Sequence, residues 1–85
     1  MCKVMFSYRS YKSYHSLPTD CQEDLLFWLE EQLGSHPNPK LMGKRVEGSL
    51  YEFCYFDFSG SMILAEWQSD RLVILDIIQK HSNIV

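Results

Sequence analysis

The amino-acid sequence predicts an α+β fold, in which an N-terminal strand and a helical hairpin pack on a mostly antiparallel sheet of about four strands. Two helix-forming segments in the first half of the chain and three strand-forming segments in the second half give the element order β-α-α-β-β-β. A length of 85 residues leaves room for one hydrophobic core. We therefore expect a single domain over residues 1–85.

The chain opens with a short β-type segment that leads directly into a helix. Lys3–Phe6 is rich in strand-forming residues, and Ser7 is a good helix N-cap. Tyr8, Tyr11 and Tyr14 then recur every three residues, which places them on one face of a short helix. We expect this tyrosine stripe to pack against the core, and a platform that stacks nucleic-acid bases is the alternative.

A second helix follows the break at Leu17-Pro18 and gives the clearest pattern in the chain. Thr19 and Gln22 fit a capping box, and Gly34 is placed to end the helix. The apolar residues between them recur at helical spacing: Leu25, Leu26, Trp28, Leu29 and Leu33. The two helices therefore form a hairpin whose apolar faces need a sheet to cover them.

Residues 35–48 are expected to form a loop, because two prolines interrupt regular structure there and two glycines lie near its end. This segment holds the densest positive cluster in the sequence, formed by Lys40, Lys44 and Arg45. We regard the three side chains as candidate phosphate contacts, and an ordinary solvated loop is the alternative.

Three segments of the second half predict strands separated by turns: 49–58, 62–67 and 72–78. The last of them is nearly all apolar, so we expect a central strand that is buried on both faces. The N-terminal strand is then expected beside it, with the helical hairpin over one face of the sheet.

Charge is distributed unevenly along the chain. The net charge is -3, and residues 46–85 carry two basic against six acidic side chains. Nucleic-acid binding usually requires a basic surface, so charge alone argues mildly against that class. No apolar run approaches the roughly 18 residues that a membrane span needs, and we expect no membrane partner.

The three cysteines, Cys2, Cys21 and Cys54, are an odd number without close pairing. Together with the lack of a secretory signal, they favour a reduced protein in the cytoplasm, with unreactive buried thiols as the default. The cysteines and histidines lack the spacing of zinc ligands, so we expect no metal and no other cofactor.

Several short stretches combine into a resemblance that covers nearly the whole chain. They are Val4-Met5-Phe6-Ser7, Leu17-Pro18 with Gln22, Trp28-Leu29 with Leu33, the Pro37–Pro39 loop, Leu41 ahead of Gly48, Leu50-Tyr51-Glu52-Phe53, Leu72-Val73-Ile74-Leu75-Asp76-Ile77 and His81-Ser82-Asn83-Ile84-Val85. With these stretches the chain resembles the RelE/ParE superfamily of bacterial toxin-antitoxin toxins, and HigB-like and YafQ-like members in particular. The resemblance implies a RelE-like fold.

The resemblance also implies ribosome-dependent, metal-independent cleavage of mRNA, which inhibits translation. Such cleavage needs a base for the 2′-hydroxyl proton, an acid for the leaving 5′-oxygen and positive charge near the phosphate. His81 matches the C-terminal histidine of YafQ-like members, and Lys80 beside it can supply charge. Glu52 is a candidate base or else a solvated strand residue. Tyr55 either orients the phosphate or packs against its neighbours.

Two departures from the family pattern leave a second interpretation open. Met62 stands where the family usually carries an arginine, and the strand segment 53–57 contains no lysine or arginine. The alternative is a ParE-like or catalytically lost member that acts by binding DNA gyrase or only its antitoxin. An unrelated small α+β interaction module is the third interpretation.

The resemblance finally implies partners. These are a cognate antitoxin encoded by a neighbouring gene and, for an active enzyme, the ribosome and mRNA, whose phosphates Lys40, Lys44 and Arg45 would contact. An antitoxin normally lays an extended or helical segment over the helices and the sheet. Exposed aromatic residues such as Trp67 or Phe58 would suit that interface.

Overall fold

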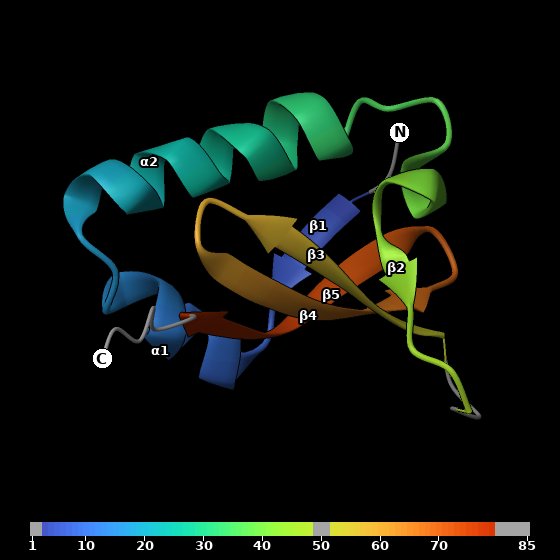
Figure 1. Ribbon diagram of the computed structural model, residues 1–85. Helices are drawn as coiled ribbons and strands as arrows, with labels where there is room; N and C mark the ends of the chain where they lie inside the picture. Colours follow the sequence, from blue (N-terminus) through green and yellow to red (C-terminus); the bar gives the residue numbers. More distant parts are fainter. Residues whose placement is uncertain (1–2, 49–51, 80–85) are drawn as a thin grey trace.

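A five-stranded mixed sheet in the order β1-β5-β4-β3-β2 forms the centre of the computed structural model, which describes residues 3–48 and 52–79 (Figure 1). The strands are β1 (Lys3–Phe6), β2 (Lys44–Arg45), β3 (Phe53–Phe58), β4 (Ser61–Gln68) and β5 (Arg71–Gln79). The helical elements are α1 (Tyr8–His15), α2 (Thr19–Phe27), the π-helical η1 (Trp28–Leu33) and the 3-10 turn η2 (Pro39–Met42). Strand β1 runs parallel to β5, and the other neighbouring pairs are antiparallel.

This arrangement confirms the predicted α+β class, the position of the last strand inside the sheet and the N-terminal strand beside it. The expected count of about four strands is exceeded by β2, a two-residue strand inside the segment that was expected to be a loop. The same segment contains η2, because a proline at the first position of a 3-10 turn needs no amide hydrogen.

Helix α1 packs along the part of β5 that extends beyond the end of β1. The last pair of that ladder is Phe6 with Ile74, and the Ser7 amide continues it by donating to the Ile74 carbonyl at 2.9 Å. The Ser7 side chain accepts from the Ser10 amide, which confirms the predicted N-cap. Ser10 is fully buried and donates its hydroxyl to the Ile74 carbonyl at 2.6 Å, so a small polar residue holds the helix against the strand.

The expectation that the tyrosine stripe packs against the core is wrong for two of its three members. Tyr8 is 78% and Tyr11 is 53% exposed, and only Tyr14 packs against the core cluster. Residues three apart on an α-helix are offset by about 60° at each step, because 3.6 residues complete a turn. The stripe therefore turns away from the core.

Helix α2 begins without the expected capping box. Pro18 occupies the N-cap position and makes no side-chain cap hydrogen bond, so Thr19 is already the first helical residue. The Gln22 side chain instead donates to the Leu17 carbonyl at 2.8 Å. The helix continues as η1, where Gly34 donates its amide five residues back to the Leu29 carbonyl. No helix of residues 3–48 and 52–79 is long and apolar enough to cross a membrane.

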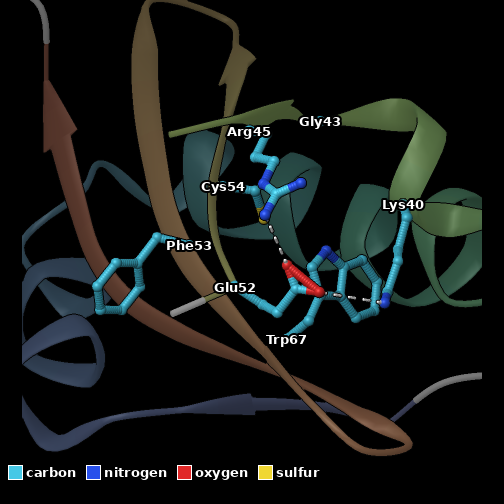
Figure 2. Close-up of a pocket in the computed structure, with 7 residues that line it drawn as sticks. All are labelled: Lys40, Gly43, Arg45, Glu52, Phe53, Cys54 and Trp67. Atoms are coloured by element: carbon cyan, nitrogen blue, oxygen red, sulfur yellow. Dashed lines mark ion pairs between the residues drawn. The ribbon is translucent and has the colours of Figure 1, made fainter. Parts of the chain in front are cut away.

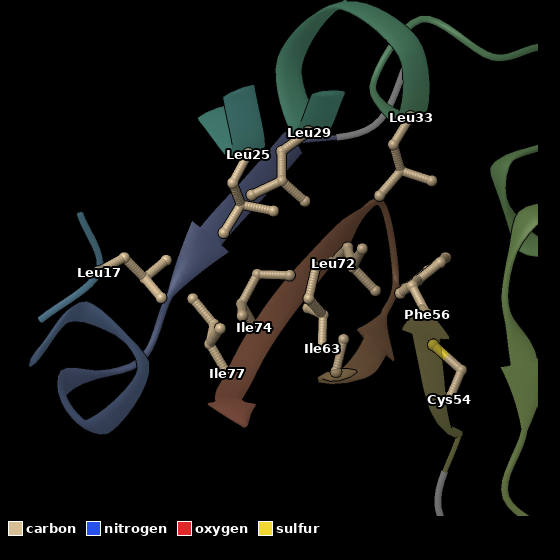
Figure 3. Packing of buried hydrophobic residues seen from close by; sticks show 11 residues of the cluster. Leu17, Leu25, Leu29, Leu33, Cys54, Phe56, Ile63, Leu72, Ile74 and Ile77 are labelled. Carbon is tan, nitrogen blue, oxygen red and sulfur yellow. The ribbon is translucent and has the colours of Figure 1, made fainter. Parts of the chain in front are cut away.

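The hydrophobic core lies between α2, η1 and one face of the sheet (Figures 1 and 3). Leu25, Leu29 and Leu33 follow each other at a spacing of four residues and point at this sheet face. The buried cluster consists of Leu17, Leu25, Leu29, Leu33, Cys54, Phe56, Ile63, Ala65, Leu72, Ile74 and Ile77. Alternate residues of β3, β4 and β5 therefore build the core, as the pleat of a sheet requires.

The expectation that the last strand is buried on both faces is wrong. Leu72 and Ile74 are fully buried, whereas Val73 is half-buried and Ile78 is 40% exposed. The helical cover lies over one face, and the residues of β5 that face the other way remain partly accessible.

Candidate functional site

A pocket of about 200 Å³ lies where β2, β3 and β4 meet the η2 turn. It is lined by Lys40, Gly43, Arg45, Glu52, Phe53, Cys54 and Trp67 (Figure 2). The Phe53 ring points away from the other side chains of the pocket, so its contribution comes from the backbone. The pocket thus combines two cations, a carboxylate, an indole and a thiol.

Backbone pairing fixes the positions of the lining residues. Arg45 lies opposite Cys54 in the β2–β3 ladder. The Trp67 amide donates to the Glu52 carbonyl at 2.9 Å, which extends the β3–β4 ladder by one pair. Glu52 and Arg45, which are separate in sequence, are therefore brought to the same corner of the sheet by regular strand pairing.

Gly43 allows the η2 segment to approach the sheet closely. A Cβ atom at this position would lie 2.6 Å from Cε1 of the Phe56 ring. Phe56 is buried and cannot move aside easily. A glycine at this position therefore lets the backbone between Lys40 and Arg45 pass over the ring and hold both cations near Glu52.

Glu52 lies between two cations. One carboxylate oxygen is 4.0 Å from the Lys40 Nζ, and the other is 3.8 Å from a guanidinium nitrogen of Arg45. The side chains are about half or more exposed, so solvent screens the pairs and they contribute little to stability. The arrangement fixes opposite charges around the mouth of the pocket and leaves them accessible to a ligand.

Trp67 forms the apolar wall of the pocket. The Lys40 ammonium lies 5.8 Å from the centroid of its ring, within the range of a cation–π contact. Burial raises the pKa of the Cys54 thiol from 9.0 to about 11, and a hydrogen bond from the Trp67 side chain acts in the opposite direction. The Cys54 thiol beside the indole is therefore neutral at neutral pH.

A second hollow, of about 250 Å³, adjoins the pocket and shares Lys40 and Trp67 with it. Its other lining residues are His36, Pro37, Asn38, Pro39, Ser69 and Asp70. The two hollows together extend along the outer side of Trp67, from the β4–β5 turn to β2.

The predicted positive cluster is divided by the sheet. Lys40 and Arg45 meet at Glu52, whereas Lys44 pairs with Tyr55 and its ammonium lies 5.9 Å from the centroid of that ring. Because neighbouring strand residues point to opposite faces, Lys44 and Tyr55 lie on the other side of the sheet from Arg45. His81 and Lys80, the two candidates near the C-terminus, lie outside the described residues.

Sequence reasoning missed the role of Trp67, Cys54 and Gly43 in this site. Trp67 and Phe58, which would suit a partner interface if they were exposed, are both half-buried and pack against the core. Phe58 contacts Trp28, with 5.2 Å between the ring centroids. The predicted pairing of strands 49–58 and 62–67 could have indicated that Trp67 lies near Glu52. It could do so only with the register between the two strands, which the structure provides.

Residues 3–48 and 52–79 contain no group of three or more histidine, cysteine, aspartate or glutamate side chains that could hold a metal ion. The side chains that line the two hollows offer electrostatic attraction, hydrogen bonding and an aromatic ring for stacking.

No protein-family model matches the chain, and no curated protein matches its sequence. Its fold, in contrast, matches solved structures along nearly the whole chain. A chain of the toxin-antitoxin complex RelBE2 from Mycobacterium tuberculosis superposes with a TM-score of 0.80 at 17% identity, covering 93% of this chain and 98% of that chain. The protein has the RelE fold.

Two further structures agree with this assignment. The isolated E. coli RelE toxin gives a TM-score of 0.74 at 16% identity, covering 98% of this chain and 88% of that chain. The archaeal RelE-RelB complex from Pyrococcus horikoshii OT3 gives 0.69 at 15% identity, covering 96% and 98%. On this RelE fold, β3 and β4 contain no lysine or arginine, so the cations of the pocket come from η2 and β2 at the edge of the sheet.

Proposed function

We propose that this protein is the toxin of a toxin-antitoxin pair and that it inhibits translation by cleaving mRNA on the ribosome. The observation that carries the proposal is the RelE fold, which extends over 93% to 98% of the chain against three structures that contain a RelE toxin or a RelBE complex. The alignments also cover 88% to 98% of the three matched chains, so the shared unit is the whole domain.

In the proposed reaction the 2′-hydroxyl oxygen of the mRNA attacks the neighbouring phosphorus and the bond from phosphorus to the 5′-oxygen breaks. The 2′-hydroxyl loses its proton, and the leaving 5′-oxygen gains one. We assign proton transfer to His81, because an imidazole can act as acid or base near neutral pH, and positive charge to Lys80. Lys40 and Arg45 support RNA binding, since they lie together at an accessible edge of the sheet. The reaction requires no metal or other cofactor.

Glu52 and Tyr55 have different roles in the proposed function. They project from opposite sides of the sheet, so they cannot both contact one scissile phosphate. Glu52 lies with Lys40 and Arg45 and belongs to the RNA-contacting edge. Tyr55 lies under Lys44 and is assigned to orientation of the RNA on the other face.

A cognate antitoxin is the proposed protein partner, as in the RelBE complexes that share the fold. Met5 and Ile78, which are 43% and 40% exposed, offer apolar surface on β1 and β5 that such a partner can bury. Co-expression with the product of a neighbouring small gene should yield a complex that purifies through a tag on either chain. Failure of every neighbouring product to bind would remove the antitoxin from the proposal.

Growth of a bacterial host tests the toxin assignment directly. Induction of the wild-type chain should arrest growth and translation, and co-expression of the antitoxin should restore both. His81→Ala should be harmless, whereas His15→Ala, a matched change at an exposed position on α1, should remain toxic. Normal growth with wild-type protein at the same expression level would contradict the proposal.

One observation favours the second candidate function, a ParE-like or catalytically lost protein that acts by binding. Strands β3, β4 and β5 together contain a single arginine or lysine, Arg71, so the middle of the sheet offers little charge to a phosphate. In this case the pure protein should inhibit DNA supercoiling by gyrase or bind only its antitoxin, and mRNA should remain intact. Inhibited gyrase with intact mRNA would replace the first proposal by the second.

A further inference from the structure

We propose that the pocket of about 200 Å³ lined by Trp67 and Glu52, here called the Trp67 pocket, binds one guanine base. The base belongs either to a free nucleotide or to single-stranded RNA. The proposal concerns binding and not cleavage, so it stands or fails independently of the toxin function. It rests on three features of the pocket: an aromatic ring in its wall, a carboxylate at its rim and two cations beside that carboxylate.

The indole of Trp67 provides the stacking surface. The Lys40 ammonium lies over the ring, at 5.8 Å from its centroid. The Lys40 side chain is 58% exposed, so it can swing aside when a flat ligand enters. Bases stack on aromatic side chains without much dependence on sequence, so the indole accounts for binding of a base but not for its identity.

Glu52 provides the selectivity. A carboxylate only accepts hydrogen bonds, and its two oxygens match two adjacent N–H donors. The Watson–Crick edge of guanine presents such a pair, N1–H and the N2 amino group, whereas adenine, cytosine and uracil each present a donor next to an acceptor. The distances of 4.0 Å and 3.8 Å from Glu52 to Lys40 and Arg45 exceed a hydrogen bond, so both oxygens can still accept from a base.

The surrounding groups suit the sugar and the phosphate. Arg45 and Lys40 flank the carboxylate and leave a net positive charge at the mouth, which favours a phosphate. The adjoining hollow of about 250 Å³ supplies the polar side chains of His36, Asn38, Ser69 and Asp70, and the Asp70 carboxylate is ion-paired with Arg71. The pocket itself, about 200 Å³, is smaller than the roughly 300–1,000 Å³ of sites for drug-sized ligands and suits a single base.

Titration calorimetry of the full chain at low salt tests the proposal. The probes are GMP, AMP, CMP and UMP, together with the RNA tetranucleotides UGUU and UAUU. GMP should bind at least about tenfold more tightly than the other three nucleotides, because their edges cannot satisfy both carboxylate oxygens. If GMP is weak but UGUU is preferred to UAUU, the ligand is guanine within RNA. Equal affinity for all bases, or no binding of any probe, would overturn the proposal.

Three variants place the ligand in the pocket. Glu52→Gln should weaken GMP binding about tenfold and leave AMP nearly unchanged, and Trp67→Leu should weaken both by about tenfold. Lys12→Ala, which removes one positive charge on α1 at the far end of the sheet, is the control and should have no effect beyond twofold. Unaltered GMP binding by Glu52→Gln would contradict the assignment.

A second measurement tests the pocket in the wild-type chain, so that the test does not depend on the folding of Trp67→Leu. The wild-type chain has two tryptophans, and a Trp28→Phe variant identifies their indole N–H signals by NMR. GMP should shift the Trp67 indole signal and leave the Trp28 signal in place, because Trp28 packs between Phe56 and Phe58. A shift of the Trp28 signal alone would contradict the pocket.

Discussion

Lys44 and Arg45 are neighbours in sequence but lie on opposite faces of the sheet. The Lys44 ammonium lies 5.9 Å from the Tyr55 ring centroid, and the Arg45 guanidinium lies 3.8 Å from the Glu52 carboxylate. A strand that contains two consecutive cations cannot direct both to one phosphate. The positive cluster of the sequence therefore separates into one charge over an aromatic ring and a pair of charges around a carboxylate.

Replacement of Glu52 should affect ligand binding more than folding. The ion pairs of Glu52 are screened by solvent, so Glu52→Gln should change the free energy of unfolding by less than about 1 kcal/mol. Urea denaturation followed by circular dichroism measures this change. A loss of several kcal/mol would show that the carboxylate is a structural element and not part of a binding site.

Ser10 should be important for the attachment of α1 to β5. Ser10→Ala removes the buried hydroxyl that donates to the Ile74 carbonyl at 2.6 Å, and should cost about 1–2 kcal/mol of unfolding free energy. Ser16→Ala is the matched control, because the Ser16 hydroxyl is exposed and its hydrogen bond to the Lys12 carbonyl competes with water. Equal losses in the two variants, measured by chemical denaturation, would contradict the role of Ser10.

Leu29 should be one of the most sensitive positions of the core. Leu29 lies on the side of η1 that faces the sheet and is 1% exposed. Leu29→Ala should therefore destabilise the fold by about 2–5 kcal/mol. Leu26 is 36% exposed on the same helical segment, and Leu26→Ala should cost less than about 1 kcal/mol. Thermal and urea unfolding of both variants test the difference, and similar costs would show that the helix is rotated from the orientation described.

Cys54 should make stability depend on pH in the alkaline range. The folded-state pKa of the thiol is raised from 9.0 to about 11, so the unfolded chain loses its proton at lower pH than the folded chain. The contribution is therefore complete below pH 9 and is lost as the pH rises toward about 11, by roughly 1–2 kcal/mol.

Comparison of two cysteine variants isolates this contribution. Between pH 8.5 and 11, Cys54→Ala should lose less stability than the wild type. Cys21→Ala, at an exposed cysteine, should follow the wild-type curve. Parallel curves for all three proteins would show that the Cys54 thiol does not titrate differently in the folded state.

Local patterns predicted much of the fold. The apolar run 72–78 located an interior strand of the sheet, β5, and the N-cap at Ser7 located the start of α1. Local patterns failed at the start of α2, where a different residue from the predicted one occupies the N-cap position. Pro18 occupies the N-cap position of α2, so the capping box of Thr19 and Gln22 does not form.

The site was harder to predict than the fold because it depends on register between distant segments. The pairing of Arg45 with Cys54 and the bond from Trp67 to Glu52 together determine which side chains share the pocket. A shift of one residue would exchange Arg45 for Lys44. The sequence offers no local signal for such a register, and β2 has only two residues.

Cleavage of mRNA in a reconstituted translation reaction tests the central claim most directly. Wild-type protein and the His15→Ala control should produce new 5′ ends within the coding region, only when ribosomes are translating, and His81→Ala should reduce their yield by at least about a hundredfold. Intact mRNA with folded wild-type protein, or equal cleavage by His81→Ala, would contradict the account.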